Sequence, residues 1–176
     1  MTGFGQGGIK LTPKNVSKKT WGNFTASAEY TVNGNNSFTK NVGGTWNGRI
    51  TSNQQYFGPV KLEGTLLGDD SCFSLDKNRY VAFPYNGDYC WYLQPGSLIY
   101  CRMNGVNYSG PFAHLPNSIY GIRKYYNGVS WTIEWYVKTN GVKIIIITFN
   151  TMVNEILGFL GGAFLLGNIL TVSNNR

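Results

Sequence analysis

Apolar and polar residues alternate along much of this chain, and the alternation is clearest over residues 129–138. Trp131, Ile133, Trp135 and Val137 alternate with Thr132, Glu134, Tyr136 and Lys138. Successive side chains of a β-strand point to opposite faces, so this spacing predicts a strand with one face in the core and a wetter face opposite. With its neighbours it predicts a three-stranded antiparallel meander over residues 118–149.

Six Asn-Gly dipeptides separate the apolar segments, at 33–34, 47–48, 86–87, 104–105, 127–128 and 140–141. Asn and Gly both tolerate positive φ, which the tight turns of β-hairpins require. A turn at 127–128 would place Tyr120 opposite Trp135, and a turn at 140–141 would place Trp135 opposite Ile146. Further strands are predicted at 21–32, 45–51, 57–67, 79–83, 89–93 and 97–103. Such evenly spaced strands indicate a sandwich or barrel.

The two ends of the chain differ from this pattern. Residues 1–19 form a predicted extended arm that is rich in glycine and carries Lys10, Lys14, Lys18 and Lys19 without any acidic residue. Residues 20–173 are predicted to form a single domain. Residues 156–172 are apolar, but this run is shorter than the roughly 20 residues of a membrane span. It also contains Asn168, so we expect one or two buried closing strands that bend at Gly161-Gly162.

Composition and charge narrow the choice of fold and partner. The chain has 176 residues, of which 15% are aromatic and only 13% charged, and 23 are glycine. This composition indicates a turn-rich all-β domain that is large enough to bury a hydrophobic core. The net charge of +7 suits nucleic acid, an anionic membrane or an acidic glycan. Because the lysines crowd into the arm, we expect a strap onto a neighbouring subunit, or a solvated tail, rather than a nucleic-acid or membrane site. The first residues lack the features of a signal peptide, which favours assembly in a cytoplasm.

Three cysteines are present, Cys72, Cys90 and Cys101. A symmetric hairpin about Pro95-Gly96 would place Cys90 opposite Cys101, with Cα atoms about 5 Å apart. A disulfide between them is then geometrically possible. The alternative is a pair of buried, reduced thiols, which an odd number of cysteines favours.

Residues suited to catalysis are sparse. His114 is the only histidine and lies in a loop bounded by prolines, without an adjacent nucleophile. Glu134 has no acidic partner at strand spacing, so a pair of catalytic carboxylates is not expected. A calcium site at Asp69, Asp70 and Asp76 stays open, although aspartate is also an ordinary turn residue. We expect neither a resident metal nor a cofactor.

The order of several motifs resembles a known family. They are residues 46–52 (Trp-Asn-Gly-Arg-Ile-Thr-Ser), residues 88–96 (Asp-Tyr-Cys-Trp-Tyr-Leu-Gln-Pro-Gly), the strands at 98–101 and 119–123, residues 140–144, and the glycine pair at 161–162 before the last apolar strand. Over residues 20–173 the chain resembles the concanavalin A-like lectin/glucanase β-sandwich. It is most similar to the LamG-like branch found in adhesins, phage proteins and large DNA virus proteins.

This resemblance implies an all-β, antiparallel two-sheet jelly-roll β-sandwich. Enzymes of the superfamily carry a Glu-x-Asp-x-x-Glu-type strand, whereas residues 131–136 contain one acid only. Legume-type calcium and manganese ligands are not recognisable either. The resemblance therefore points to a non-enzymatic role in binding or assembly.

Three functional hypotheses follow. The first is a structural protein of a virus particle, such as a minor capsid or appendage component, whose basic arm lies on adjacent subunits. The second is a carbohydrate-binding adhesion module, because sugar sites combine aromatic platforms with hydrogen-bonding side chains. The candidate glycan-binding residues are Asp88, Trp91, Tyr92, Arg102, Asn104 and Tyr108. Core packing is the alternative role of Trp91 and Tyr92. The third is a membrane-active protein that uses residues 156–172.

Overall fold

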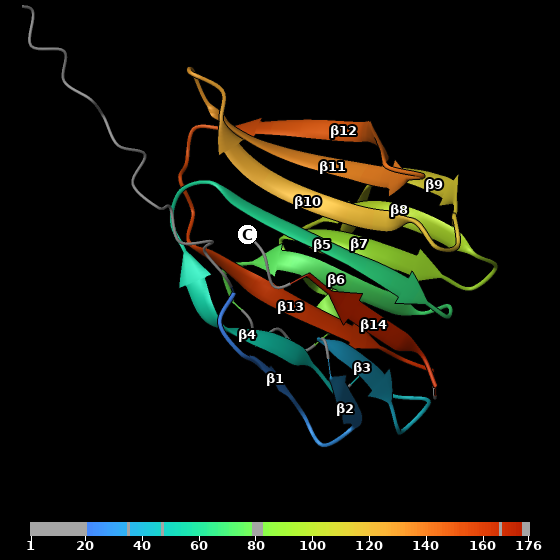
Figure 1. Cartoon of the computed structure of the whole chain (residues 1–176). Coiled ribbons are helices and arrows are strands. Elements are labelled where there is room, and N and C mark those ends of the chain that lie inside the picture. The colour runs from blue at the N-terminus through green and yellow to red at the C-terminus, as the bar shows by residue number, and fades with distance from the viewer. Residues whose placement is uncertain (1–20, 35, 47, 79–82, 166, 174–176) are drawn as a thin grey trace, which may run out of the picture.

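The computed structural model describes residues 21–34, 36–46, 48–78, 83–165 and 167–173 (Figure 1). The predicted arm with Lys10, Lys14, Lys18 and Lys19, and all but the last residue of the predicted strand at 79–83, lie outside the described residues. Within them the chain forms fourteen strands and a single 3₁₀ turn, η1 (Pro84–Asn86). The predicted all-β fold is therefore confirmed.

The strands build two antiparallel sheets of seven strands each. The first sheet has the order β1-β4-β13-β6-β7-β8-β9. Its strands are β1 (Phe24–Ala26), β4 (Ile50–Tyr56), β13 (Leu157–Ala163), β6 (Ser71–Asp76), β7 (Tyr89–Gln94), β8 (Leu98–Met103) and β9 (Val106–Ala113). The second sheet has the order β12-β11-β10-β5-β14-β3-β2. Its strands are β12 (Val142–Thr151), β11 (Trp131–Thr139), β10 (Ile119–Tyr126), β5 (Val60–Leu67), β14 (Ile169–Val172), β3 (Ser37–Lys40) and β2 (Tyr30–Gly34).

The core lies between the sheets, and two tryptophans join them. Trp91 of the first sheet donates its indole N–H to the Gly121 carbonyl of the second, at 2.9 Å. Trp135 of the second sheet donates to the Cys90 carbonyl of the first, at 3.2 Å. Both side chains are fully buried. Each therefore buries a large apolar surface while its one polar group is satisfied across the layer.

The apolar C-terminal run forms two closing strands, as predicted. β13 lies between β4 and β6 in the first sheet, and β14 lies between β5 and β3 in the second. The predicted bend at Gly161-Gly162 is wrong, because both glycines lie inside β13 and the chain changes sheets after Ala163. A Cβ atom on Gly161 would come within 2.6 Å of the Leu170 side chain, so this glycine serves close packing. Among the described residues, no helix has the length and apolar character to cross a membrane.

The predicted meander is present, but its registers differ from the prediction. Ile122, not Tyr120, faces Trp135, because a four-residue loop replaces the expected two-residue turn. Asn127 closes that loop by accepting hydrogen bonds from the Val129 and Ser130 amides at 3.0 and 2.9 Å. Trp135 faces Ile147 rather than Ile146, because a β-bulge inserts one extra residue into β12.

The predicted pairing of Cys90 with Cys101 is wrong. The hairpin turns through three residues, with Ser97 at φ 57°, so Cys90 pairs with Arg102 and Cys101 with Trp91. A shift of one residue moves a side chain to the other face of a sheet. Cys101 accordingly packs in the core, whereas Cys90 lies on the outer face beside Cys72. All three thiols are buried and unbridged.

Candidate functional site

The outer face of the second sheet gathers much of the chain's charge. The sequence predicted a wetter face at Thr132, Glu134 and Tyr136, but all three are buried, with Glu134 fully inaccessible and Tyr136 1% exposed. Basic side chains lie around Glu134 and Tyr136, and Asn127 and Asn150 bond to Thr132, which is why the prediction of a wetter face is wrong here. These basic residues stand around two glutamates and make the candidate site.

Glu134 of β11 lies between two cations from the adjacent strands. Arg123 of β10 forms a two-point contact with its carboxylate, at 2.9 Å from Nη2 and 2.8 Å from Nε. Lys143 of β12 donates to the same carboxylate from the other side. Burial alone would raise the pKa of Glu134, but the hydrogen bonds from Arg123 and Lys143 hold it below its usual range. This carboxylate is therefore ionised at neutral pH.

Glu63 of β5 forms a second group of the same kind. The Tyr136 hydroxyl donates to its carboxylate at 2.6 Å. Lys61 lies 3.2 Å from the other oxygen, and Lys138 also forms an ion pair with Glu63. Burial would raise the pKa of Glu63, yet the bonds from Lys138 and Tyr136 keep it below its usual range. Glu63 is thus also ionised at neutral pH.

Tyr136 joins the two groups because it lies flat on the sheet. A Cβ atom on Gly121, its neighbour on β10, would come within 2.1 Å of the Tyr136 ring. Only glycine leaves room for the ring there. The Lys143 and Lys138 ammonium groups stand over this ring, 4.3 and 5.7 Å from its centre. The face of the Tyr136 ring therefore makes cation–π interactions with both ammonium groups.

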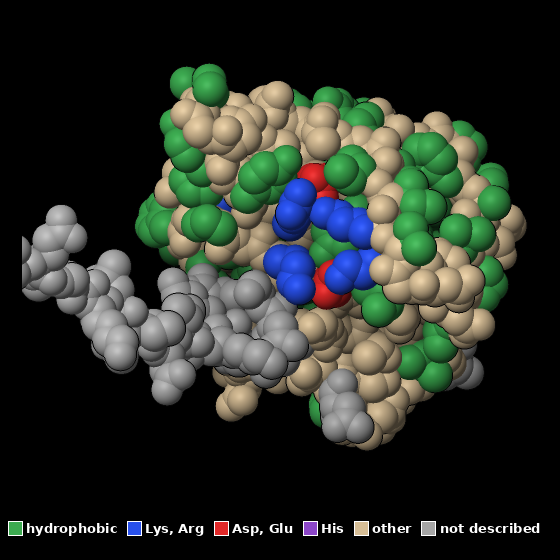
Figure 2. Space-filling view, turned by 45° about the horizontal axis from the view of Figure 1, so that its top comes forward, with side chains coloured by type: hydrophobic (Ala, Val, Ile, Leu, Met, Phe, Trp, Pro, Cys, Tyr) green, Lys and Arg blue, Asp and Glu red, His purple; other side chains and the backbone are tan. Residues whose placement is uncertain are grey.

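These side chains define the charged hollow, whose members are Lys61, Glu63, Arg123, Glu134, Tyr136, Lys138 and Lys143. Figure 2 shows Lys and Arg side chains gathered around a hollow on one face, with acidic side chains between them. A depression of about 280 Å³ opens beside Lys61, Arg123 and Tyr125. Four cations face two ionised carboxylates, so the hollow has a surplus of two positive charges.

The structure does not bring the six predicted glycan-binding residues together at one place. Trp91 is buried between the sheets. Tyr108 lies on the edge strand β9, with its ring against Trp135 and Phe149. Asn104 occupies the β8–β9 turn at φ 51°. Tyr92 and Arg102 share the outer face of the first sheet, and Asp88 immediately precedes β7.

Tyr92 belongs to an aromatic cluster, made of Trp46, Phe83, Tyr85, Tyr92 and Phe164. Tyr85 of η1 stacks on Tyr92 with ring centres 5.4 Å apart. The Arg102 guanidinium lies 5.1 Å from the centre of each of these two rings. Only 7% of Tyr92 is exposed. The chain itself thus covers the ring that was predicted as a sugar platform.

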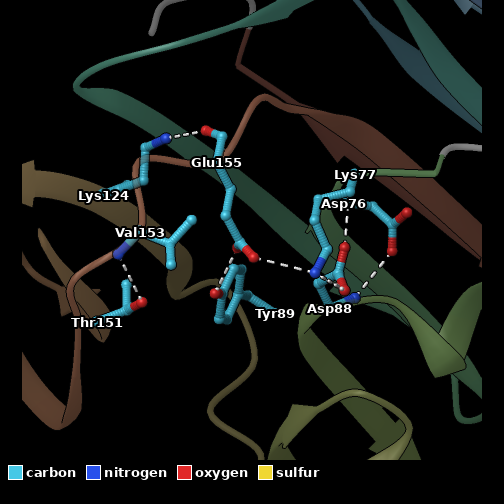
Figure 3. Close-up of polar contacts among 8 residues, drawn as sticks. All are labelled: Asp76, Lys77, Asp88, Tyr89, Lys124, Thr151, Val153 and Glu155. Atoms are coloured by element: carbon cyan, nitrogen blue, oxygen red, sulfur yellow. Dashed lines mark hydrogen bonds and ion pairs between the residues drawn. The ribbon is translucent and has the colours of Figure 1, made fainter.

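Asp88 takes part in a clasp that joins the β12–β13 connection to β6 and β7 (Figure 3). Lys77 lies 3.0 Å from Glu155 and 3.3 Å from Asp88. The Tyr89 hydroxyl donates to the other oxygen of Glu155 at 2.8 Å. The Asp88 amide donates to Asp76 at 2.8 Å. These contacts tie neighbouring segments together, which is a structural use of Asp88.

The three aspartates considered for calcium are separated by their partners. Asp69 accepts from the amides of the β7–β8 turn, and Asp70 accepts from the Tyr92 hydroxyl at 2.8 Å. Asp76 lies in the clasp. Over the part of the chain that the structure describes, no group of three or more His, Cys, Asp or Glu side chains is placed to hold a metal ion.

His114 stacks on Tyr120, with ring centres 5.5 Å apart. Burial lowers its pKa, while the Asp69 charge and a bond to the Leu66 backbone act in the opposite direction. The contacts of its ring are therefore with an aromatic side chain and with backbone.

Sequence reasoning missed the charged hollow because it depends on strand register. Under the predicted register Glu134 would face Gly121, whereas the four-residue loop brings it opposite Arg123. A usable signal was present: Arg123, Glu134, Lys138 and Lys143 fall at outward positions of three consecutive strands. Lys61 and Glu63 lie on β5, which pairs with β10 of the meander. No local sequence pattern predicts that pairing.

No family model matches the sequence, and no curated protein matches it. Solved structures do resemble it. The TRIM65 PSpry domain has a TM-score of 0.61 at 13% identity and covers 86% of this chain and 92% of that chain. A legume lectin-like domain from Entamoeba histolytica has a TM-score of 0.56 at 12% identity and covers 88% of this chain and 91% of that chain.

A third similar structure is the VIP36 exoplasmic/lumenal domain in its Ca²⁺/Man₃GlcNAc-bound form. Its TM-score is 0.50 at 12% identity, over 87% of this chain and 83% of that chain. SPRY and legume lectin-like domains share one architecture. The chain has the concanavalin A-like β-sandwich fold, as the resemblance implied.

Proposed function

We propose that this chain is a non-catalytic recognition module that binds acidic glycans in the charged hollow. One observation carries the proposal: in a chain with few charges, six charged side chains from four strands meet on one open face with two positive charges in surplus. An anionic ligand would neutralise that surplus. Sugars suit such a site because hydroxyl groups accept and donate hydrogen bonds beside a charged group.

Free donors on the cations support this role. An ammonium group has three N–H donors and a guanidinium has five. Lys61 and Lys138 each form an ion pair with Glu63 while their side chains stay 37% and 32% exposed. The remaining donors face solvent at the rim of the hollow. Carboxylate, sulfate or phosphate oxygens of a glycan are the matching acceptors.

A binding role rather than hydrolysis agrees with the state of the two glutamates. A glycosidase needs one carboxyl with a raised pKa as its general acid. Here the pKa values of both Glu63 and Glu134 lie below their usual range, so neither holds a proton at neutral pH. The VIP36 structure, which contains a bound mannose oligosaccharide, supports the proposal only as a glycan-binding example of the same fold.

The test is calorimetric titration of the full chain with a sialylated oligosaccharide, a sulfated glycosaminoglycan fragment, a neutral mannose oligosaccharide and a short single-stranded DNA. We expect binding to at least one acidic glycan, weaker binding at higher salt, and none to the neutral sugar. The sialylated oligosaccharide presents a carboxylate and the glycosaminoglycan fragment presents sulfate groups, so their relative affinities show which anionic group is recognised. Equal binding of DNA and glycan, or no binding of either acidic glycan, would contradict the proposal.

The variant Lys138→Gln should weaken the affinity for the acidic glycan about fivefold, because one charge at the rim contributes up to about 1 kcal/mol. Lys77→Gln is the matched control. It removes the same charge from an exposed ion pair of the clasp, outside the hollow, and should leave affinity unchanged. A melting curve for each variant shows that the fold is kept.

Assembly is the second candidate function that we propose, and the exposed edge strand β12 favours it. In the form predicted from the sequence, the chain is a component of a virus particle, and residues 1–19 lie on adjacent subunits. Deletion of residues 1–20 should then prevent incorporation into particles while the domain still folds. Normal incorporation of the shortened chain would rule out this role of the arm.

A further inference from the structure

The four edges of the two sheets are unequally protected against pairing with another strand. Edge strands are usually short, interrupted by proline or irregular, because their free N–H and C=O groups would otherwise recruit a partner. β1 has three residues and β2 has five. β9 contains Pro111 and two register shifts. β12 has ten residues, no proline and a single bulge, so it is the least protected edge.

The side chains of β12 make this edge apolar as well as long. Its sequence is Val-Lys-Ile-Ile-Ile-Ile-Thr-Phe-Asn-Thr, with one charged residue, Lys143. Val142, Ile144 and Ile145 are 62%, 52% and 53% exposed. The other edge of the same sheet, β2, ends in Asn33-Gly34 and exposes mainly polar groups. Such a long and largely apolar edge predicts that another strand covers it in solution.

The bulge divides β12 into two halves that match each other. Before it, Lys143 and Ile145 share the outer face with Lys138 and Tyr136 of β11. After it, Thr148 faces Glu134 and therefore also points outward. Ile146 and Ile147, at the bulge, both pack toward the core. The outward positions are thus arranged symmetrically about the bulge.

We infer that β12 pairs antiparallel with β12 of a second copy of this chain, about a two-fold axis at the bulge. In this register outward residues meet outward residues: Ile145 faces the partner's Thr148 and Lys143 faces the partner's Asn150. On the inner face, Ile144 meets the partner's Phe149, an aliphatic–aromatic pair that stabilises antiparallel ladders. No lysine faces a lysine.

Charge favours a second copy over residues 1–19 of this chain as the partner of β12. Residues 1–19 carry four lysines and no acid, and pairing with β12 would bring them beside Lys143 and the positive hollow. The edge of β12 offers no acidic side chain to compensate them. A second β12 brings only one charge and places it at the far end of the ladder.

Pairing would join the two second sheets into one continuous sheet. The two-fold axis stands perpendicular to that sheet, so both charged hollows lie on the same face. A surface with repeated acidic groups could then engage both at once, which raises avidity. The dimer itself does not depend on the proposed ligand, and the experiment below uses no glycan.

Sedimentation equilibrium of the full chain tests the inference. We expect a reversible dimer, with a mass approaching twice 19.6 kDa as concentration rises. Ile145→Lys should weaken self-association at least tenfold, because each dimer then holds two new charges in the ladder. Val32→Lys is the matched control. It places the same charge on β2, the opposite edge of the same sheet, at a residue that is 60% exposed, and should leave the dimer intact.

A monomer at all concentrations, or equal effects of the two lysine variants, would overturn the inference. The register has its own test. The double variant Ile145→Cys/Thr148→Cys should form covalent dimers under mild oxidation, while Val32→Cys should not. The native cysteines do not interfere because all three are buried. A dimer that forms no covalent link through residues 145 and 148 would contradict the proposed register.

Discussion

At the scale of single residues, the charge and position of each group in the site depend on its neighbours. Glu134 is fully buried yet ionised, because Arg123 and Lys143 compensate the loss of water. Gly121 is needed because it has no Cβ atom, and any Cβ at this position would overlap the Tyr136 ring. The hydroxyl of that ring then reaches Glu63. Gly121 thus makes room for the ring that bonds to Glu63.

Gly121→Ala should therefore lower the free energy of unfolding by about 2 kcal/mol, the usual cost of forcing extra volume into a packed site. In a Tyr136→Ala background the same substitution should cost far less, because the ring is gone. Urea unfolding of the two single variants and the double variant measures this coupling. Equal costs in both backgrounds would show that Tyr136 is not the obstacle.

At the scale of elements, the clasp fixes the connection between β12 and β13. The connection passes from the second sheet to the first, and Lys77, Tyr89 and Lys124 hold it at Glu155 (Figure 3). Beside them Asp76 is 1% exposed. Burial, and next the charge of Asp88, raise the pKa of Asp76 to about 7. Folding thus increases the proton affinity of this carboxyl.

The raised pKa of Asp76 makes the stability of the fold depend on pH. Between the unfolded pKa of about 3.9 and the folded pKa of about 7, only the folded state binds the proton. The contribution of Asp76 to stability is therefore full at the acidic end of this window and is lost as pH rises through 7. Relative to the native chain, Asp76→Asn should gain stability from pH 5 to pH 8, by up to about 1.4 kcal/mol per pH unit. Urea unfolding at several pH values checks this, and a pH-independent difference would contradict it.

At the scale of the whole molecule, the last two strands in the sequence complete the two sheets. The C-terminal strands β13 and β14 occupy interior positions, one in each sheet. Without them β4 and β6 would lose a shared partner in the first sheet, and β5 and β3 would lose theirs in the second. These pairings join residues that are distant in sequence, which slows the formation of both sheets.

Removal of residues 157–176 should accordingly abolish cooperative folding, since both sheets would be split. Near-ultraviolet circular dichroism and resistance to proteolysis provide the measurement. Removal of residues 1–20 is the comparison, and it should leave a folded domain because the core of the described residues is built from Trp21 and residues after it. A folded, cooperative product from the C-terminal truncation would show that the two halves of the sandwich are independent.

The sequence by itself determined the all-β class, the meander and the C-terminal closing strands, because alternation and turn residues act locally. Only the tertiary structure decided the registers. A one-residue difference placed Cys90 and Cys101 on opposite faces, and a two-residue difference brought Arg123 to Glu134. The charged hollow needs β5 beside β10, a pairing across more than fifty residues. Such pairings depend on the order of strands within a whole sheet, which no short stretch of sequence encodes.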